Sequence, residues 1–533
     1  MSQWPQQQMP YGYQPGAPPG PTPQYAAPQY APPSEPFYTD NKSPYDNGRF
    51  KPKKRVNDPI VLILFILQFL GFVVVSGIAI AEWVKDGGLG GGLGKNKTGT
   101  SVSLNQSTVF LLLLVTAAAL LLSTIYLMLV RAFTKVIMHI TLILNILLNI
   151  AICAYYWVTK YYCVSHCLFP CASHSPRHLP SFSRSHNARF PPLFSILSYY
   201  GFKSRIPLAS LLLQVVIDVS KHHKSVYVVA FTALIFQALL AIWFTFAAIA
   251  TYAKWTPGNP SCETTSCSSG KVAGLIFFLV FSFLWTSQVI GNVALATLAG
   301  GPYGCWYYFG PRGEGDMPKH PTLSAFGRAS TLSLGSIAFG SLIVTLLELL
   351  KMVLRAAEHS ADAEGHPVEA CLACCAACFV GIIENLVEYF NRYAYIEIAL
   401  YGKPYITAAK DTWRLLTDRG VSAIVNDSLV GMTLTWGGYA VGLLSSLFAY
   451  LYLRLTEPAY NADGNYTAPV LLFAFLIGLQ CSLTLSSAIE AGVSTIFVGL
   501  GEDPQVLAIR APALFGVSLE ELPSFITYFH PRS

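Results

Sequence analysis

Eight stretches of the sequence contain no Asp, Glu, Lys or Arg, and each is 19 to 28 residues long. A helix rises about 1.5 Å per residue and the hydrocarbon core of a bilayer is about 30 Å thick, so each stretch is long enough to cross it. We therefore predict an all-α polytopic membrane protein. The stretches are 59–81, 109–130, 136–159, 226–253, 272–298, 329–347, 428–453 and 468–489.

Composition supports this class and argues against several others. Only 12% of the residues are charged, against about 25% in ordinary soluble domains. The net charge of +6 comes from short basic clusters between apolar stretches, as expected of topology determinants, so we predict no nucleic-acid partner. The glycine-rich stretch 87–94 ends in Lys95-Asn96 and not in Lys-Ser or Lys-Thr, so it is not a nucleotide-binding loop. No grouping of nucleophile, base and orienting residue suggests an enzyme, and we predict no cofactor and no metal ion.

The chain divides into three parts by composition. Residues 1–58 are rich in Pro, Gln, Tyr and Gly and end in a basic cluster that includes Lys53, Lys54 and Arg55. We predict a disordered cytosolic tail there, either a docking or trafficking segment or an extension without a specific site. Residues 59–500 form the predicted transmembrane domain, and 501–533 form a cytosolic C-terminal tail.

With the N-terminus inside, the loops predicted outside carry features typical of that side. Asn96 and Asn465 each begin an Asn-X-Thr sequence, so both are predicted glycosylation sites. Cys262 and Cys267 lie in another outside loop, where a local disulfide is expected, with two free thiols as the alternative.

Loop charges require two further crossings, which makes about ten transmembrane helices with both ends cytosolic. The fourth would use 206–219, which is only 14 residues and contains Asp218. The eighth would use 370–383, because otherwise the basic residues that follow it would lie outside. One conflict remains, since Lys351 and Arg355 fall outside in this plan.

Residues 163–192 interrupt the predicted fourth helix. The segment is rich in Ser, His, Pro, Arg and Cys and has no acidic residue. Its cysteines and histidines could ligate zinc, although they match no known finger pattern. The alternatives are an irregular loop or disulfide-bearing insertion, and translated intron, which is the favoured hypothesis. Sequencing the transcript decides this, because a mature message that encodes 163–192 excludes the gene-model explanation.

Three passages carry a family resemblance: Arg-Ile-Pro-Leu-Ala at 205–209, Leu-Gly-Ser-Ile-Ala-Phe-Gly-Ser-Leu-Ile at 334–343, and Asn-Arg-Tyr-Ala-Tyr-Ile-Glu-Ile-Ala-Leu-Tyr-Gly-Lys at 391–403. Together they resemble the choline transporter-like family, and the tail suggests its fungal "pH nine sensitive" branch. The resemblance covers about 59–515, except for 163–192. It implies a multi-pass plasma-membrane protein with ten spans that transports choline or a related organic cation.

A quaternary ammonium has no N–H to donate, so its site needs aromatic faces and a carboxylate. Ionisable groups at membrane depth are functional candidates by default. The residues predicted to bind substrate are Asp218, Trp285, Phe339 and Glu348, chosen from a wider set that included Trp243, Trp436, Glu384 and Glu388.

Ser336 and Gly340 have the small-xxx-small spacing of closely packed helices, so helix packing is predicted, with a moving contact as the alternative.

The expected mechanism is facilitated alternating access. The alternative function is a structural or regulatory plasma-membrane protein that transports nothing. The oligomeric state stays open.

Overall fold

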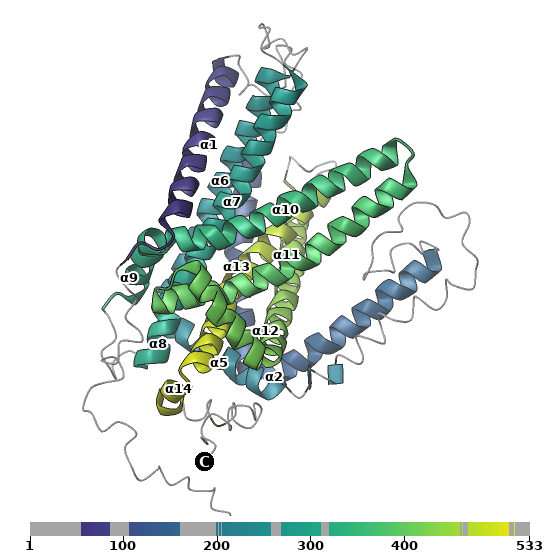
Figure 1. Ribbon diagram of the computed structural model, residues 1–533. Coiled ribbons are helices and arrows are strands. Elements are labelled where there is room, and N and C mark those ends of the chain that lie inside the picture. The colour runs from purple at the N-terminus through teal and green to yellow at the C-terminus, as the bar shows by residue number, and fades with distance from the viewer. Residues whose placement is uncertain are drawn as a thin grey trace, which may run out of the picture. The chain divides into compact units, whose positions relative to one another are not determined.

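The computed structural model describes residues 55–85, 106–159, 199–200, 202–203, 205–256, 268–310, 319–458, 461, 467–510 and 516. Asn96, Asn465, Cys262, Cys267 and the segment 163–192 lie outside these residues, as does almost all of the predicted N-terminal tail. Within the described part, every regular element is a helix, which confirms the all-α membrane class (Figure 1).

In chain order the elements are α1 (Pro59–Lys85), α2 (Gln106–Thr159), α5 (Ile206–His222), α6 (Ser225–Trp255), α7 (Ser269–Leu298), the π-helical turn η3 (Ala299–Tyr303), α8 (Gly304–Phe309), α9 (Pro321–Gly327), the π-helical turn η4 (Arg328–Leu332), α10 (Leu334–Ala363), α11 (Pro367–Tyr401), α12 (Tyr405–Thr456), α13 (Thr467–Glu502) and α14 (Pro504–Arg510).

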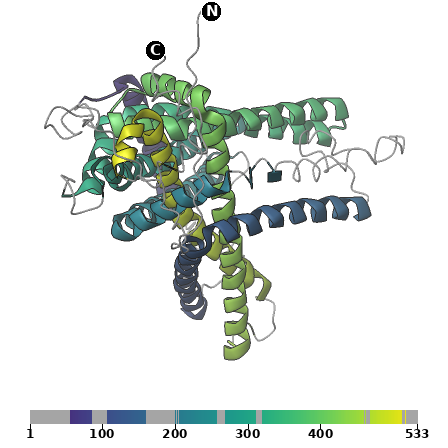
Figure 2. The same cartoon turned by 90° about the horizontal axis from the view of Figure 1, so that it is seen from below.

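Eight of the described helices contain a stretch long and apolar enough to cross a membrane. α2 holds two of the charge-free stretches and breaks between them at Phe133, whose backbone is not helical; Figure 2 shows its two arms pointing in different directions. The inferred eighth crossing corresponds to α11. The inferred fourth corresponds to α5, which at 17 residues is shorter than the helices counted as candidate spans.

Helical hairpins form the membrane domain, and small residues set how closely their helices approach. α12 packs along α13, α10 along α11 and α6 along α7. Between α12 and α13, a Cβ added to Gly478 would come within 2.5 Å of the Ser445 hydroxyl and 3.0 Å of the Gly442 Cα. Only glycine allows such an approach, as in other closely packed membrane helices.

The conflict between Lys351 and the charge rule has a structural explanation. The Lys351 ammonium forms an ion pair with the Glu384 carboxylate of α11, and the Glu384 side chain is 10% exposed. A lysine at membrane depth usually pairs with an acidic group. Lys351 is therefore part of the contact between α10 and α11 and not a loop charge.

The chain after α7 does not leave the helical bundle at once. η3 contains Pro302 and a non-helical backbone at Gly301, which redirects the chain into α8. A Cβ on Gly300 would lie 2.8 Å from the Ala399 carbonyl oxygen of α11, so this break packs tightly against a neighbouring helix.

α14, in the stretch predicted as a tail, packs against α8 and buries Leu507.

Candidate functional site

A cavity of about 610 Å³ lies between α6, α7, α11 and α13. This volume is within the range of small-molecule sites in proteins. Each helix contributes residues at helical spacing, such as Gln288, Asn292 and Leu295 on α7. The polar residues of the wall are Gln237, Gln288, Asn292, Asn385, Glu388, Tyr389, Asn391, Arg392, Tyr395, Gln480, Thr484 and Ser487.

Several of these polar groups are held in place by neighbours behind the wall. The Asn292 side-chain amide donates to the Ser341 hydroxyl at 2.9 Å, and the Gln237 amide donates to the Ser287 carbonyl at 3.3 Å. The Asn391 amide donates to the Gly340 carbonyl at 3.0 Å. Amide groups anchored in this way present fixed dipoles to the cavity.

Arg392 is the cationic group of the wall and is bound on its far side by two acids. Its guanidinium lies 3.2 Å from the Glu490 carboxylate and 3.6 Å from that of Asp427. Asp427 is only 2% exposed and Arg392 33%, and the Ser494 hydroxyl donates to Asp427 at 3.1 Å. This cluster of Arg392, Asp427 and Glu490 contains one guanidinium and two carboxylates. Because its negative groups outnumber its positive one, it does not attract anions to the cavity.

Glu388 is the carboxylate that faces the cavity itself. Within the described residues it has no hydrogen-bond or ion-pair partner, whereas its helical neighbour Glu384 is paired with Lys351. The rings of Tyr389 and Tyr395 belong to the same wall. A carboxylate beside aromatic faces suits an organic cation.

Beyond the end of α7, the tyrosines of η3 and α8 are buried in the helical bundle. The Tyr303 hydroxyl donates to the Ala488 carbonyl at 2.9 Å, and the Tyr308 hydroxyl bonds to Asp503 at 2.8 Å and to the Tyr401 hydroxyl at 2.7 Å. We call Tyr303, Tyr307, Tyr308, Tyr401 and Asp503 the tyrosine layer. Its first tyrosine, Tyr303, is in η3, which begins directly after Leu298, a residue of the cavity wall.

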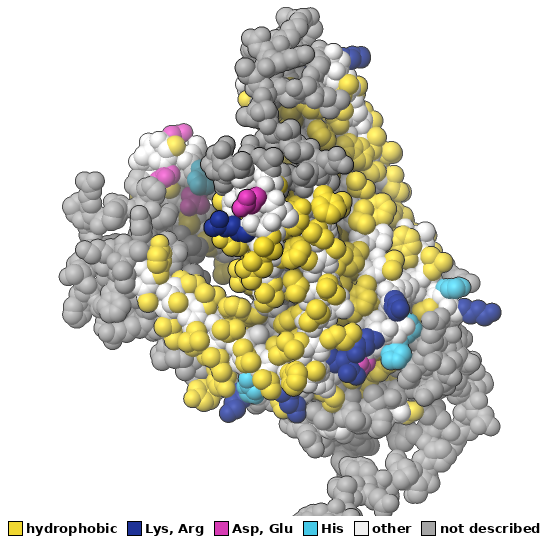
Figure 3. Space-filling view, turned by 180° about the vertical axis from the view of Figure 1, so that it is seen from behind, with side chains coloured by type: hydrophobic (Ala, Val, Ile, Leu, Met, Phe, Trp, Pro, Cys, Tyr) yellow, Lys and Arg dark blue, Asp and Glu magenta, His cyan; other side chains and the backbone are white. Residues whose placement is uncertain are grey.

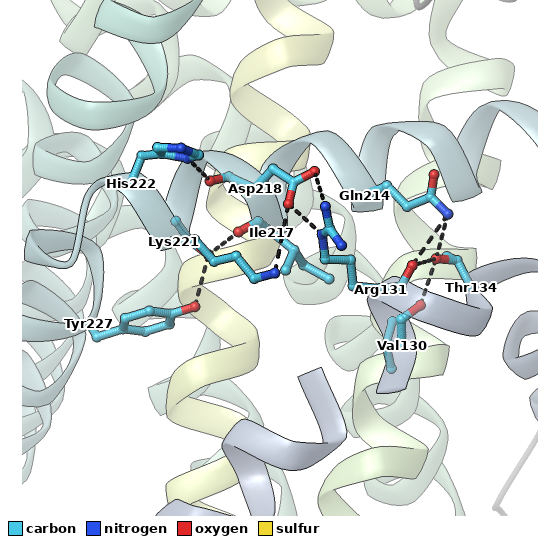
Figure 4. A network of polar contacts seen from close by, with 10 residues as sticks. Val130, Arg131, Thr134, Gln214, Ile217, Asp218, Lys221, His222 and Tyr227 are labelled. Carbon is cyan, nitrogen blue, oxygen red and sulfur yellow. Dashed lines mark hydrogen bonds and ion pairs between the residues drawn. The ribbon is translucent and has the colours of Figure 1, made fainter. Parts of the chain in front are cut away.

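The residues predicted from sequence to bind substrate lie elsewhere in the structure. Asp218 is 41% exposed and pairs with Arg131, with Lys221 4.0 Å away (Figure 4). Glu348 lies among the charges of Lys351, Glu384 and Glu388. Neither lines the polar cavity.

The two predicted aromatics are packing groups in this conformation. Trp285 is fully buried, and its indole nitrogen donates to the Ala338 carbonyl at 3.0 Å. Phe339 packs against the Tyr405 ring, with 4.8 Å between ring centroids.

Ser336 and Gly340 both lie at helix contacts. The Ser336 hydroxyl donates to the Asp58 carboxylate at 2.6 Å. A Cβ on Gly340 would lie 2.5 Å from the Tyr395 hydroxyl. The structure thus places both residues of the small-xxx-small pair against other segments of the chain.

The cavity residues have a signal in the sequence that is separate from the carboxylates and aromatic residues expected of a cation site. Gln237, Gln288, Asn292 and Gln480 interrupt stretches that are otherwise almost wholly apolar. Polar side chains in membrane helices face the protein interior or a water-filled cavity. Within the described residues, no group of three or more His, Cys, Asp or Glu residues could hold a metal ion.

Comparison with known proteins agrees with the motifs in the sequence. The model of a family described as "Plasma-membrane choline transporter" matches residues 192–505. Protein PNS1 of Cryptococcus neoformans is 53% identical over 92% of this chain and 87% of its own length. Protein PNS1 of Mycosarcoma maydis is 37% identical, covering 94% and 90%, and that of Candida albicans is 36% identical, covering 88% of each. The chain therefore belongs to the choline transporter-like family of multi-pass membrane proteins, a transporter-like family and not one of enzymes.

Proposed function

We propose that this protein carries choline or a related small organic cation across the plasma membrane by alternating access through the cavity between α6, α7, α11 and α13. The observation that carries the proposal is the Glu388 carboxylate, which lines a polar cavity between membrane helices and has no hydrogen-bond or ion-pair partner among the described residues. An ionisable group at this depth is costly, so its presence favours a role with a charged substrate.

The chemistry of the wall fits a cation without N–H donors. Glu388 supplies the opposite charge, and the rings of Tyr389 and Tyr395 supply electron-rich faces, worth about 0.5–2 kcal/mol each toward a bound ammonium. The amides of Gln288 and Asn292 can bind the hydroxyl of an alcohol such as choline. The substrate-binding roles expected of Asp218, Trp285, Phe339 and Glu348 pass in this proposal to these cavity residues.

Alternating access needs an end of the cavity that closes and opens, and in this proposal the tyrosine layer closes it. By the charge rule the tyrosine layer lies toward the cytosol, so release of substrate to that side requires the Tyr308–Asp503 and Tyr308–Tyr401 hydrogen bonds to break. The first joins a hydroxyl to a carboxylate and the second joins two hydroxyls, each with a modest net free energy of about 0.5–3 kcal/mol. Such bonds are compatible with repeated opening.

Uptake of labelled choline and other organic cations into liposomes containing the purified full chain tests the proposal. Glu388→Gln should raise the choline KM about tenfold, since loss of about 1.4 kcal/mol of binding corresponds to that factor. Glu364→Gln is the matched control, because Glu364 is exposed at the turn between α10 and α11.

A second pair of variants separates the ring of Tyr389 from its hydroxyl. Tyr389→Phe keeps the aromatic face and should keep uptake, whereas Tyr389→Leu should lower it. Wild-type protein that folds in liposomes but moves no organic cation would contradict transport and favour a structural or regulatory role. A tagged chain imaged in its own cell tests the plasma-membrane location.

A further inference from the structure

A larger hollow of about 1140 Å³ lies outside the polar cavity, between α1, α6, α7 and α9. Its walls are apolar over most of their length, and several of the side chains are strongly exposed, including Val228 at 65% and Phe236 at 57%. We call this hollow the α6–α9 groove. Its apolar walls include Phe65, Phe69, Val228, Phe236, Leu239 and Trp243.

One end of the α6–α9 groove is cationic. Lys224 and Lys319 line it together with His222, His223 and His320, and no acidic residue is among the described residues of its wall. The Ser225 hydroxyl lies 2.8 Å from that of Thr322, which ties the start of α6 to α9 and brings the two lysine-bearing segments to the same end. Figure 3 shows Lys, Arg and His side chains bordering an extensive apolar surface.

The dimensions of the groove fit a lipid better than a soluble ligand. Along α6 it runs from Lys224 to Trp243, which is roughly 28 Å at 1.5 Å per residue. One leaflet occupies half of a hydrocarbon core about 30 Å thick. An acyl chain that starts at the lysines therefore remains in contact with the groove along its whole length.

We propose that the α6–α9 groove is a binding site for an anionic phospholipid of the cytosolic leaflet. The phosphate and the acidic headgroup contact Lys224 and Lys319, and one acyl chain lies against α1, α6 and α7. The cationic end lies toward the cytosol by the charge rule. A zwitterionic lipid would offer one phosphate to two lysines and bring a cation of its own, and a free phosphate would leave the apolar walls unused.

The α6–α9 groove and the polar cavity lie on two sides of the same helices. Ala233 of α6 and Ala294 of α7 line both the groove and the cavity. A bound lipid therefore packs against the same two helices that form the cavity wall. Binding of a lipid to the groove does not depend on transport, so it can be measured without any assumption about the transported substrate.

Native mass spectrometry of the purified full chain tests this site. In detergent with equal amounts of phosphatidylcholine and phosphatidylserine, the wild-type protein should retain mainly phosphatidylserine. Each lysine near an anionic headgroup contributes roughly a fivefold preference, so K224Q/K319Q should bring the ratio of the two bound lipids close to one. Lys410→Gln, which removes an exposed lysine on α12 outside the groove, should leave the preference unchanged.

Two further measurements separate a lipid site from a simple anion site. Val228→Trp fills the groove below the lysines and should lower retention of both lipids. Excess glycerophosphoserine, which has the headgroup without acyl chains, should not displace phosphatidylserine. Equal retention of the two lipids by the wild type, an unchanged preference in K224Q/K319Q, or displacement by glycerophosphoserine would each overturn the proposal.

Discussion

The Ser336 hydroxyl donates a 2.6 Å hydrogen bond to the Asp58 carboxylate, which joins residues 278 positions apart. The same carboxylate oxygen accepts the backbone N–H of Tyr405 at 2.9 Å. Asp58 directly precedes α1, Ser336 is in the first turn of α10, and Tyr405 begins α12. One carboxylate therefore holds the ends of three helices together.

Replacement of Asp58 should destabilise this junction measurably. Asp58→Ala removes the acceptor for Ser336 and for the start of α12, and we expect a loss of about 1–3 kcal/mol in unfolding free energy. Ser336→Ala should cost about 1 kcal/mol, and the double variant should cost less than the sum, because the two residues interact directly. Unfolding in detergent micelles measures all three. Ser330→Ala, whose half-buried hydroxyl bonds only to carbonyls of the preceding turn among the described residues, should stay within about 0.5 kcal/mol of wild type.

Gly340 should tolerate no side chain. A Cβ there would lie 2.5 Å from the Tyr395 hydroxyl and 2.7 Å from the Tyr405 ring, so Gly340→Ala overpacks the contact and should cost about 1–3 kcal/mol. Gly327→Ala is the matched control, because a Cβ at Gly327 has no atom within 4 Å. Melting temperatures in detergent compare the two. Equal effects of both substitutions would show that the α10–α11 contact is not tightly packed.

Most of the fold could be predicted from the charge-free stretches, because membrane helices exclude charges in a way that the sequence displays directly. The fourth crossing could not be predicted from such a stretch, since α5 is short and carries Asp218. The break in α2 at Phe133 was visible only as the two charges Arg131 and Lys135 that separate its arms.

The candidate site was harder to predict because its residues gain their meaning from distant partners. Asp218 looked like a carboxylate at membrane depth, yet its partner Arg131 is 87 positions away. Glu384 and Glu388 look equivalent in sequence, but Lys351 pairs with only the first. Pairing in space, which no local pattern reveals, distinguishes a structural charge from one that faces the cavity.

Loss of the Arg392 guanidinium should leave two carboxylates without their cation. Arg392→Gln is expected to cost about 3–5 kcal/mol, as breaking a buried ion pair usually does. Arg392→Gln combined with Asp427→Asn should recover part of the loss, because one of the two uncompensated charges is then removed. Unfolding in detergent measures both. Arg414→Gln, on a side chain 80% exposed, serves as the control and should change little.

Tyr308→Phe should loosen the tyrosine layer without removing a ring. The variant loses the bonds to Asp503 and Tyr401, so the closed end should open more often. Cys305, only 2% exposed beside the layer, is a natural reporter. Its labelling by a maleimide, followed by peptide mass spectrometry, should be faster in Tyr308→Phe than in wild type. An unchanged rate would show that these hydrogen bonds do not control access.

If the cavity carries a cation without a compensating charge, uptake should follow the membrane potential. An inside-negative potential of about 100 mV supplies about 2.3 kcal/mol per positive charge, enough to drive accumulation roughly 50-fold at equilibrium. Liposomes with a potassium gradient and valinomycin set this potential, and choline uptake by the reconstituted chain should rise as the interior becomes more negative. The same gradient without valinomycin is the control. Uptake that ignores the potential would mean that an exchanged or co-transported ion cancels the charge of the substrate, since net movement of a lone cation through the membrane must respond to it.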